Sequence, residues 1–156
     1  MSDLLFKASV LVSKIRAITG APVALVIQCS ERKAEKAGPA RELYRGPFWL
    51  TLKKAGELPK HVKCFAFSAK YGLIPADKVI PPYNVRLSKE TFSAVVQKLK
   101  SQKGVLPSGA GVVLVAGDLY KRAWLAAELP CHYVVEGAGI GYMLGAFKRW
   151  LDAIKG

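Results

Sequence analysis

Residues 65–86 read FAFSAKYGLIPADKVIPPYNVR. The segment begins as the end of an apolar strand, turns at residues 68–72, and continues through a proline-interrupted loop to Arg86. A hydroxyl, an ammonium, two phenols, a carboxylate and a carboxamide fall within this short stretch, a mixture that no element of a hydrophobic core requires. We therefore expect this loop to form the functional site and the rest of the chain to be its scaffold.

Apolar strands and amphipathic helices alternate on both sides of this segment. Continuous aliphatic runs are typical of buried strands, and they lie at Val23–Gln28, His61–Phe67, Val112–Ala116 and Cys131–Val135. Helical spacing of apolar residues predicts helices at Ser2–Thr19, Ala40–Ala55, Leu119–Leu129 and Tyr142–Ile154, and one more after Ser88. Such alternation predicts a parallel sheet covered on both faces. The expected fold is α/β: residues 1–156 form a single-domain three-layer sandwich with a mostly parallel sheet of at least four strands.

Three of these helices have further predicted features. Pro47 should either kink the helix at 40–55 or divide it into two short helices. Ser88 and Asp118 should each cap the helix that follows. The apolar positions of these last two helices are Phe92, Val95, Val96 and Leu99 in the first, and Leu119, Ala123, Leu125 and Ala126 in the second.

Polar and glycine residues follow all four predicted strands. They are Cys29-Ser30, Ser68–Tyr71, Gly117-Asp118 and Glu136–Gly139. Ligands of open α/β sheets bind beyond the carboxyl ends of the strands. These four segments are therefore expected to line one cleft together with the central loop.

The charge of the chain points to a polyanionic partner. Its 156 residues include 24 Lys and Arg against 11 Asp and Glu, a formal net charge of +13. A small domain this basic is expected to attract nucleic acid. Membrane binding is a weaker interpretation because the basic residues are spread along the chain and do not form one amphipathic helix. The N-terminal sequence lacks the pattern of a signal peptide, and no apolar run is long enough to span a membrane, so we expect a cytoplasmic protein.

No cofactor or metal is expected. The cysteines (Cys29, Cys64, Cys131) and the two histidines show no metal-ligand spacing. The glycines at 137, 139 and 141 have the spacing G-x-G-x-G, which is not the dinucleotide fingerprint, and no acidic ribose-binding residue follows. Gly139 and its neighbours could instead leave helix N–H groups accessible to a phosphate, or simply allow tight packing.

The binding residues of the central loop each have two interpretations. Tyr71 and Tyr83 could stack on an unpaired base, or they could cover the end of the sheet. Lys70 could neutralise a phosphate or, less readily, form a Schiff base with an opened sugar. Ser68 could donate to a phosphate or base, and Gly72 should supply a positive φ for the turn.

Three residues are candidates for catalysis. Asp77 could stabilise a cationic sugar or activate water, or it could form an ion pair with Lys70 or Lys78. Asn84 could read a base edge or satisfy its own turn. Asp118 is first a helix cap, and its place beside the cleft makes a catalytic role the second interpretation.

The loop after the first strand completes the expected binding surface. Cys29 lies where a nucleophile could sit, although a buried structural thiol is commoner. Arg32 and Lys33 belong to a charged run that either faces the cleft or is solvated. Ser30 and, from the central loop, Arg86 are the remaining residues expected to bind nucleic acid.

The central loop resembles the signature of a known group of proteins. The matching residues are Ser68, Ala69, Tyr71, Gly72, Leu73, Asp77, Pro82 and Tyr83, with flanking matches at Cys29-Ser30, Lys33, residues 40–44 and residues 139–141. On these residues the chain resembles an uncharacterised bacterial and phage family, of the type called domain of unknown function 6884, related to the YaaA-like peroxide-stress proteins. The resemblance implies DNA binding and a link to oxidative stress. A similar core also occurs beside enzymes that exchange bases in transfer RNA.

The charge, the loop and the resemblance together predict a nucleic-acid-binding protein that acts on bases. The expected reaction is hydrolysis of the N-glycosidic bond of a modified or damaged base, because a base that leaves the stack suits an aromatic, polar loop. The expected substrate is DNA rather than RNA. The alternative is a non-enzymatic DNA-binding stress protein. An enzyme acting on free nucleosides is a third class, for which so basic a chain is unnecessary.

Overall fold

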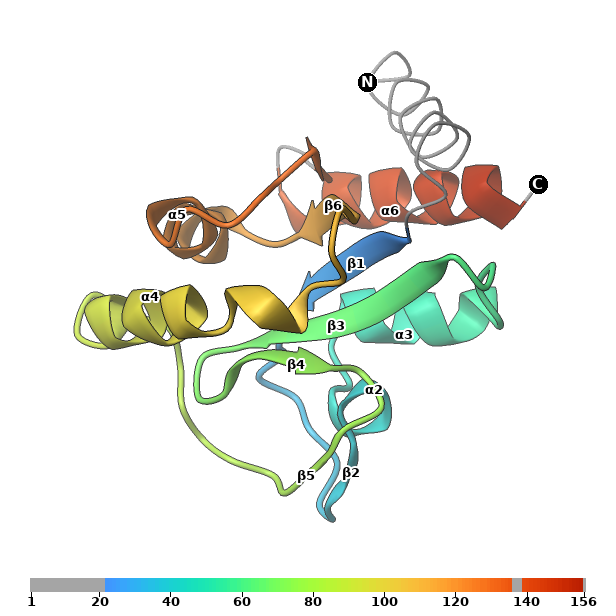
Figure 1. Cartoon of the computed structure of the whole chain (residues 1–156). Helices are drawn as coiled ribbons and strands as arrows, with labels where there is room; N and C mark the ends of the chain where they lie inside the picture. The colour runs from blue at the N-terminus through green and yellow to red at the C-terminus, as the bar shows by residue number, and fades with distance from the viewer. Residues whose placement is uncertain (1–21, 136–138, 156) are drawn as a thin grey trace.

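A five-stranded sheet forms the centre of the computed structural model, which describes residues 22–135 and 139–155 (Figure 1). Its strands are β1 (Val23–Gln28), β3 (Val62–Ser68), β4 (Gly72–Pro75), β6 (Gly111–Val115) and β7 (Tyr133–Val134), in the order β4-β3-β1-β6-β7. All neighbours are parallel except β4, which runs antiparallel to β3. The predicted α/β fold with a mostly parallel sheet is confirmed.

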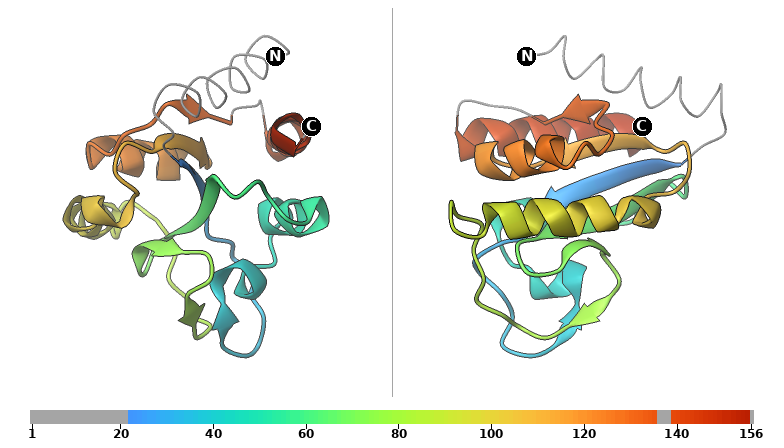
Figure 2. Two further views of the ribbon diagram at one scale, coloured as in Figure 1. Left: turned by 45° about the vertical axis from the view of Figure 1, so that its right-hand side comes forward. Right: turned by 60° about the vertical axis from the view of Figure 1, so that its left-hand side comes forward.

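Helices cover both faces of the sheet. The left-hand view of Figure 2 shows α3 (Pro47–Ala55) and α6 (Ile140–Lys155) on one side and α4 (Phe92–Ser101) and α5 (Asp118–Ala126) on the other. The result is the predicted three-layer sandwich. No helix within the described ranges has both the length and the apolar character needed to cross a membrane.

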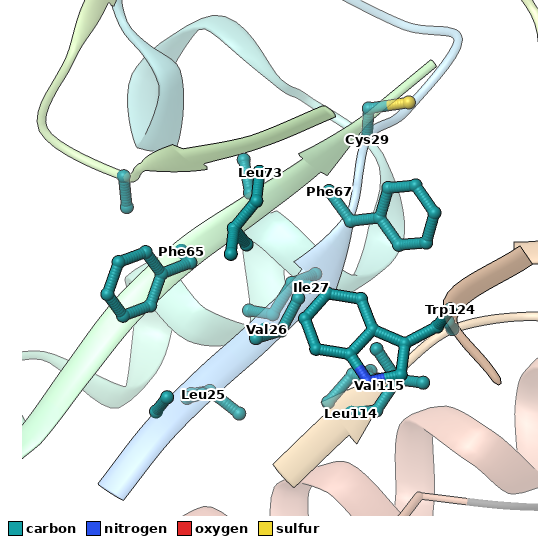
Figure 3. Close-up of a cluster of buried hydrophobic side chains, with 14 of the residues drawn as sticks. Leu25, Val26, Ile27, Cys29, Phe65, Phe67, Leu73, Leu114, Val115 and Trp124 are labelled. Carbon is teal, nitrogen blue, oxygen red and sulfur yellow. The ribbon is translucent and has the colours of Figure 1, made fainter. Parts of the chain in front are cut away.

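The core lies on both faces of the central strand. Residues 23–27 of β1 are fully buried, as expected for a strand with parallel neighbours on either side. Figure 3 shows this core between β1, β3 and β6, closed by Trp124 of α5. The ring centres of Trp124 and Phe67 are 5.8 Å apart. This rigid centre carries the polar residues that follow each strand.

The segment between β1 and β3 contains two short helices and one strand of a second sheet. The α2 helix (Ala40–Leu43) ends before Gly46, and α3 begins at Pro47, so the break predicted as one alternative at Pro47 is confirmed. Proline suits the first helical position because its missing N–H would have no partner there. The second sheet was not predicted: β2 (Gly38–Pro39) pairs with β5 (Val79–Ile80) in antiparallel fashion.

Helix starts and faces differ from the sequence predictions at several points. The α4 helix begins at Phe92 rather than directly after Ser88, whose carbonyl instead accepts the Phe92 N–H. The N-cap of α5 is Gly117, and Asp118 is its first residue. Its buried residues are Ala123 and Trp124, whereas Leu125 and Ala126 are exposed. The predicted helix at Ser2–Thr19 lies outside the described residues.

Candidate functional site

The carboxyl ends of β1, β3 and β6 meet at one edge of the sheet. The Cys29 N–H donates to the Phe67 carbonyl at 2.8 Å, and the Gly117 N–H donates to Gln28 Oε1 at 2.6 Å. The polar segments after these three strands are therefore neighbours, as predicted. Of the fourth predicted segment, Glu136 and residues 137–138 lie outside the described residues.

Ser68 at the end of β3 is fully buried and organises the turn after it. Its Oγ accepts the N–H groups of Lys70 at 3.1 Å and Tyr71 at 3.0 Å, and it lies 2.7 Å from the Tyr83 hydroxyl. A hydroxyl has two acceptor lone pairs and one proton. Because both lone pairs face amides, the Ser68 proton is donated to Tyr83, and Ser68 positions the loop rather than contacting a ligand.

Tyr83 connects the central loop to the first half of the chain. Its hydroxyl is also hydrogen-bonded to the Tyr44 hydroxyl. Burial raises the pKa of Tyr44 to about 12 and raises the pKa of Tyr83 further. Both phenols therefore stay protonated at neutral pH and hold the loop as hydrogen-bonding groups.

Aromatic rings and ammonium groups gather around Tyr83. The rings of Tyr71 and Tyr44 both pack edge-on against the Tyr83 ring, with their centres 5.4 and 6.3 Å from its centre. Lys33 Nζ lies 4.5 Å and Lys70 Nζ 5.8 Å from the Tyr83 ring centre, both within cation–π range. We call Lys33, Tyr44, Lys70, Tyr71 and Tyr83 the tyrosine–lysine cluster; four of its members were predicted as binding residues, and Tyr44 was signalled only by the resemblance.

The turn that carries Lys70 and Tyr71 is fixed from a second side. Gly72 has the predicted positive φ, +73°. Gln102, which follows α4, donates through Nε2 to the Tyr71 carbonyl at 2.9 Å and accepts the Leu73 N–H through Oε1 at 2.8 Å. Sequence reasoning missed Gln102, because nothing in the local pattern relates a glutamine at a helix end to a turn some thirty residues earlier.

Cys29 lies buried beside the cluster. Its Sγ is 3.1 Å from the hydroxyl of Tyr120, on the first turns of α5, and burial raises the pKa of that phenol. The Tyr120 ring packs edge-on against Phe67 at 5.1 Å. This environment matches the structural interpretation of the thiol, and Tyr120 is a second residue that sequence reasoning missed.

Asp77 is not part of this edge, contrary to the prediction. Because β4 runs back along β3, Gly72 is opposite Ser68, but Pro75 is opposite Phe65 and the Ala76 N–H donates to the Cys64 carbonyl. Asp77 therefore lies beside the beginning of β3. There its Oδ1 pairs with Arg41 Nε at 2.8 Å, and not with Lys70 or Lys78.

A cavity of about 980 Å³ occupies this other end of β3. The residues lining it include Arg41, Lys53, Lys60, Lys63, Cys64 and Asp77. Cys64, in the middle of the predicted strand, keeps part of its surface exposed, but its thiol is desolvated, which raises the pKa of the thiol to about 12. The cavity and the tyrosine–lysine cluster are thus at opposite ends of one strand.

Of the other two candidate catalytic residues, Asn84 adjoins the cluster in sequence and Asp118 follows β6 at the same edge of the sheet. Asp118 begins α5, in the same helix as Tyr120, and its carboxylate pairs with Arg122 at 2.9 Å. Its predicted capping role is wrong, because the Gly117 backbone occupies the cap position. Asn84 follows Tyr83 directly and is exposed.

The remaining predicted binding residues of the first half of the chain lie in the two loops that carry Lys33 and Tyr83. The Arg86 guanidinium pairs with the Glu31 carboxylate, and both side chains are exposed. Ser30 Oγ accepts the Gly46 N–H at 3.1 Å and donates to the Arg32 carbonyl at 2.7 Å, which fixes the loop that carries Lys33. Arg32 itself is exposed.

Gly139 directly precedes α6. It is exposed and has a φ of +112°. Across the residues that the structure describes, no three side chains of His, Cys, Asp or Glu are grouped so that they could hold a metal ion.

Comparison with known proteins gives one match. Residues 23–152 match the model of a family described as a family of unknown function, DUF6884. The matched range includes the whole tyrosine–lysine cluster, Gln102 and the strands that position them. Searches of curated proteins and of solved structures find no significant match.

Proposed function

Because the chain belongs to the DUF6884 family, whose function is unknown, we propose a function from the geometry of the sheet edge at which the carboxyl ends of β1, β3 and β6 meet. The protein binds nucleic acid at this edge, captures one unpaired base at the tyrosine–lysine cluster, and hydrolyses the N-glycosidic bond of a modified or damaged base. The observation that carries the proposal is the placing of two lysine ammonium groups around one half-buried tyrosine ring.

Phosphate binding is the first step of the proposed function. The net charge of +13 attracts a polyanion, and Lys33 and Lys70 are the cations nearest the rings. Lys70 is exposed and free to move from Tyr83 to a phosphate. Phosphate contacts of this kind hold the strand but do not select a base.

Base capture is the second step. Tyr71 and Tyr83 present aromatic surface at the edge, and stacking on such rings contributes about 1–3 kcal/mol per base. The buried hydroxyl chain from Ser68 through Tyr83 to Tyr44 keeps the Tyr83 ring in one orientation. A base extruded from a duplex can then be bound without reorganising the loop.

The chemical step requires a carboxylate near the sugar. Water attacks C1′ while the bond to the base nitrogen breaks, the base leaves with a proton, and positive charge develops on the sugar. Since Asp77 lies elsewhere, we assign the carboxylate role to Asp118, which stabilises this charge or accepts the proton of water. Asn84, exposed beside Tyr83, is assigned to the edge of the base.

One observation favours a second candidate, a DNA-binding protein without catalysis. Asp118 and Glu31, the carboxylates that follow β6 and β1, are both exposed and paired with arginines. Neither is in the desolvated setting that tunes many catalytic acids. We also propose the finer relationship to YaaA-like peroxide-stress proteins, on the signature at residues 68–83, and this relationship supports DNA over RNA in either candidate.

The test is incubation of the protein with DNA and RNA duplexes that carry assorted modified bases, with abasic sites scored by strand cleavage. We expect abasic sites in DNA, and we expect Asp118→Asn and Asn84→Ala to reduce their rate of formation about 10²–10³-fold with DNA affinity nearly unchanged. Asp77→Asn is the matched control and should remain active. If the protein binds nucleic acid but releases no base from any of the substrates, the non-enzymatic candidate is favoured. Failure to bind any nucleic acid at low salt would refute both candidate functions.

A further inference from the structure

We propose that Gln102 is a positioning residue of the site: its carboxamide sets the turn that presents Lys70 and Tyr71 to Tyr83, and so controls how tightly an unpaired base is held. This inference rests on the proposed function. Gln102 itself does not contact the substrate and acts through the turn.

Both ends of the Gln102 carboxamide are used on the same turn. Nε2 donates to the Tyr71 carbonyl and Oε1 accepts the Leu73 N–H, at 2.9 and 2.8 Å, so the side chain bridges the two residues that flank Gly72. The Gln102 N–H in turn donates to the Leu99 carbonyl at 3.0 Å. The bridge is therefore anchored on the last turn of α4, which packs against the core through Leu99.

Gly72 and Gln102 are matched to one another. A Cβ placed on Gly72 would lie 2.1 Å from Gln102 Oε1, well inside contact distance. Only glycine allows the carboxamide this close, and only glycine readily adopts the φ of +73° found there. The close approach brings the carboxamide within reach of the two backbone groups on either side.

The neighbouring backbone groups of the turn are also held. Lys98 Nζ, one turn earlier on α4, donates to the Lys70 carbonyl at 3.2 Å, while Ser68 accepts the N–H groups of Lys70 and Tyr71 from the opposite side. The backbone of residues 70–73 is thus fixed by side chains from two elements. The side chains left to face outward from it are Lys70, which is exposed, and Tyr71, which is half-buried against Tyr83. Such support is what a pre-organised binding group requires.

The experiment compares two duplexes that differ in one unpaired nucleotide. Fluorescence anisotropy measures the affinity of each variant for a fully paired DNA duplex and for the same duplex with a single bulged base. We expect the wild type to prefer the bulged duplex, and Gln102→Met to lose about 10-fold in affinity for it with less than a twofold change for the paired duplex. Gln97→Ala, an exposed glutamine on the same helix, is the matched control and should change neither affinity.

Methionine separates positioning from packing. It has nearly the shape of glutamine but cannot make either hydrogen bond. Gln102→Met therefore keeps the packing of the side chain and removes its hold on the turn. If Gln102→Met behaves like the wild type while Gln102→Ala does not, the residue only fills space and the inference is wrong. Should Gln102→Met fail to fold, Lys98→Met replaces it: the lost positive charge should weaken binding to both duplexes alike, whereas the lost bond to the Lys70 carbonyl should lower the preference for the bulged duplex by a smaller factor than Gln102→Met.

A second measurement needs no ligand. In the free protein, nuclear Overhauser effects should connect the Tyr71 and Tyr83 rings, whose centres are 5.4 Å apart. We expect these signals to persist in Gln97→Ala and to weaken in Gln102→Met. A wild type that shows no preference for the bulged base refutes the proposed function, whereas unchanged ring contacts in Gln102→Met refute the positioning role by themselves.

Discussion

The two ends of β4, a strand of only four residues, lie in different environments in the fold. At its start, the turn at Gly72 is fixed by Ser68 and Gln102 and carries residues of the tyrosine–lysine cluster. Beyond its end, Asp77 forms an exposed ion pair with Arg41 beside a cavity. The difference teaches that a continuous sequence signature need not be one site, because a single antiparallel strand carries Asp77 to the far end of β3 before the chain returns to the cluster at Tyr83.

The largest expected effect is at the first end of β4. Gly72→Ala places a Cβ against Gln102 Oε1 and forces a left-handed backbone on alanine. Strain and the loss of two hydrogen bonds should lower the free energy of unfolding by about 3 kcal/mol, measured by urea denaturation. Gly104→Ala is the control, because a Cβ there has nothing within 4 Å. Equal, small effects at both glycines would mean that neither the Gln102 carboxamide nor the positive φ constrains the turn at Gly72.

The phenols of Tyr44, Tyr83 and Tyr120 should make the free energy of unfolding depend on pH above 10. Burial raises the pKa of Tyr44 to about 12 and also raises those of Tyr83 and Tyr120. Above pH 10 the unfolded chain loses protons that the folded protein keeps, so the free energy of unfolding should fall, by about 1.4 kcal/mol per pH unit for each phenol.

Tyr83→Phe removes one of these phenols and should make the fall less steep. The measurement is urea unfolding at pH 9, 10 and 11. Tyr142→Phe removes an exposed phenol outside the cluster and is the control. If Tyr83→Phe follows the wild-type curve, the Tyr83 hydroxyl does not lie in the buried chain of hydroxyls.

The lysines at the two ends of β3 should differ in their effect on nucleic-acid binding. Affinity should fall steeply with salt through counterion release, and Lys33→Gln or Lys70→Gln should each reduce the slope of log affinity against log salt by about 1. Lys63→Gln, beside the cavity, should leave the slope unchanged. A reduction of equal size in Lys63→Gln would mean that the nucleic acid also reaches the other end of the strand.

The sequence predicts the sheet well because its signals are local. Aliphatic runs identify the buried strands, and parallel connections bring Cys29, Ser68 and Gly117 to one edge without knowledge of any side-chain contact. The chemistry of the central loop likewise marks Lys70, Tyr71 and Tyr83.

Three features could not be predicted because they depend on contacts between distant segments. The β4 strand is only four residues long and contains a proline, so its alternation carries no clear strand signal. Gln102 and Tyr120 look like ordinary surface and helix residues until α4 and α5 pack on the sheet. Asp118 was expected to cap its helix, but the Gly117 backbone takes that position, with its N–H satisfied by Gln28.

The smallest expected effect is at the second end of β4, and it tests the division of the signature most directly. Asp77→Asn removes an ion pair whose carboxylate side chain is 80% exposed, and such pairs contribute about 1 kcal/mol or less. The free energy of unfolding, the affinity for a bulged duplex and the rate of base release should therefore all stay close to those of the wild type. Arg41→Gln removes the same pair from the other partner and should behave alike. If Asp77→Asn alone abolished base release while the protein stayed folded, the substrate would have to extend along β3 to the cavity, and the two ends of β4 would form one site after all.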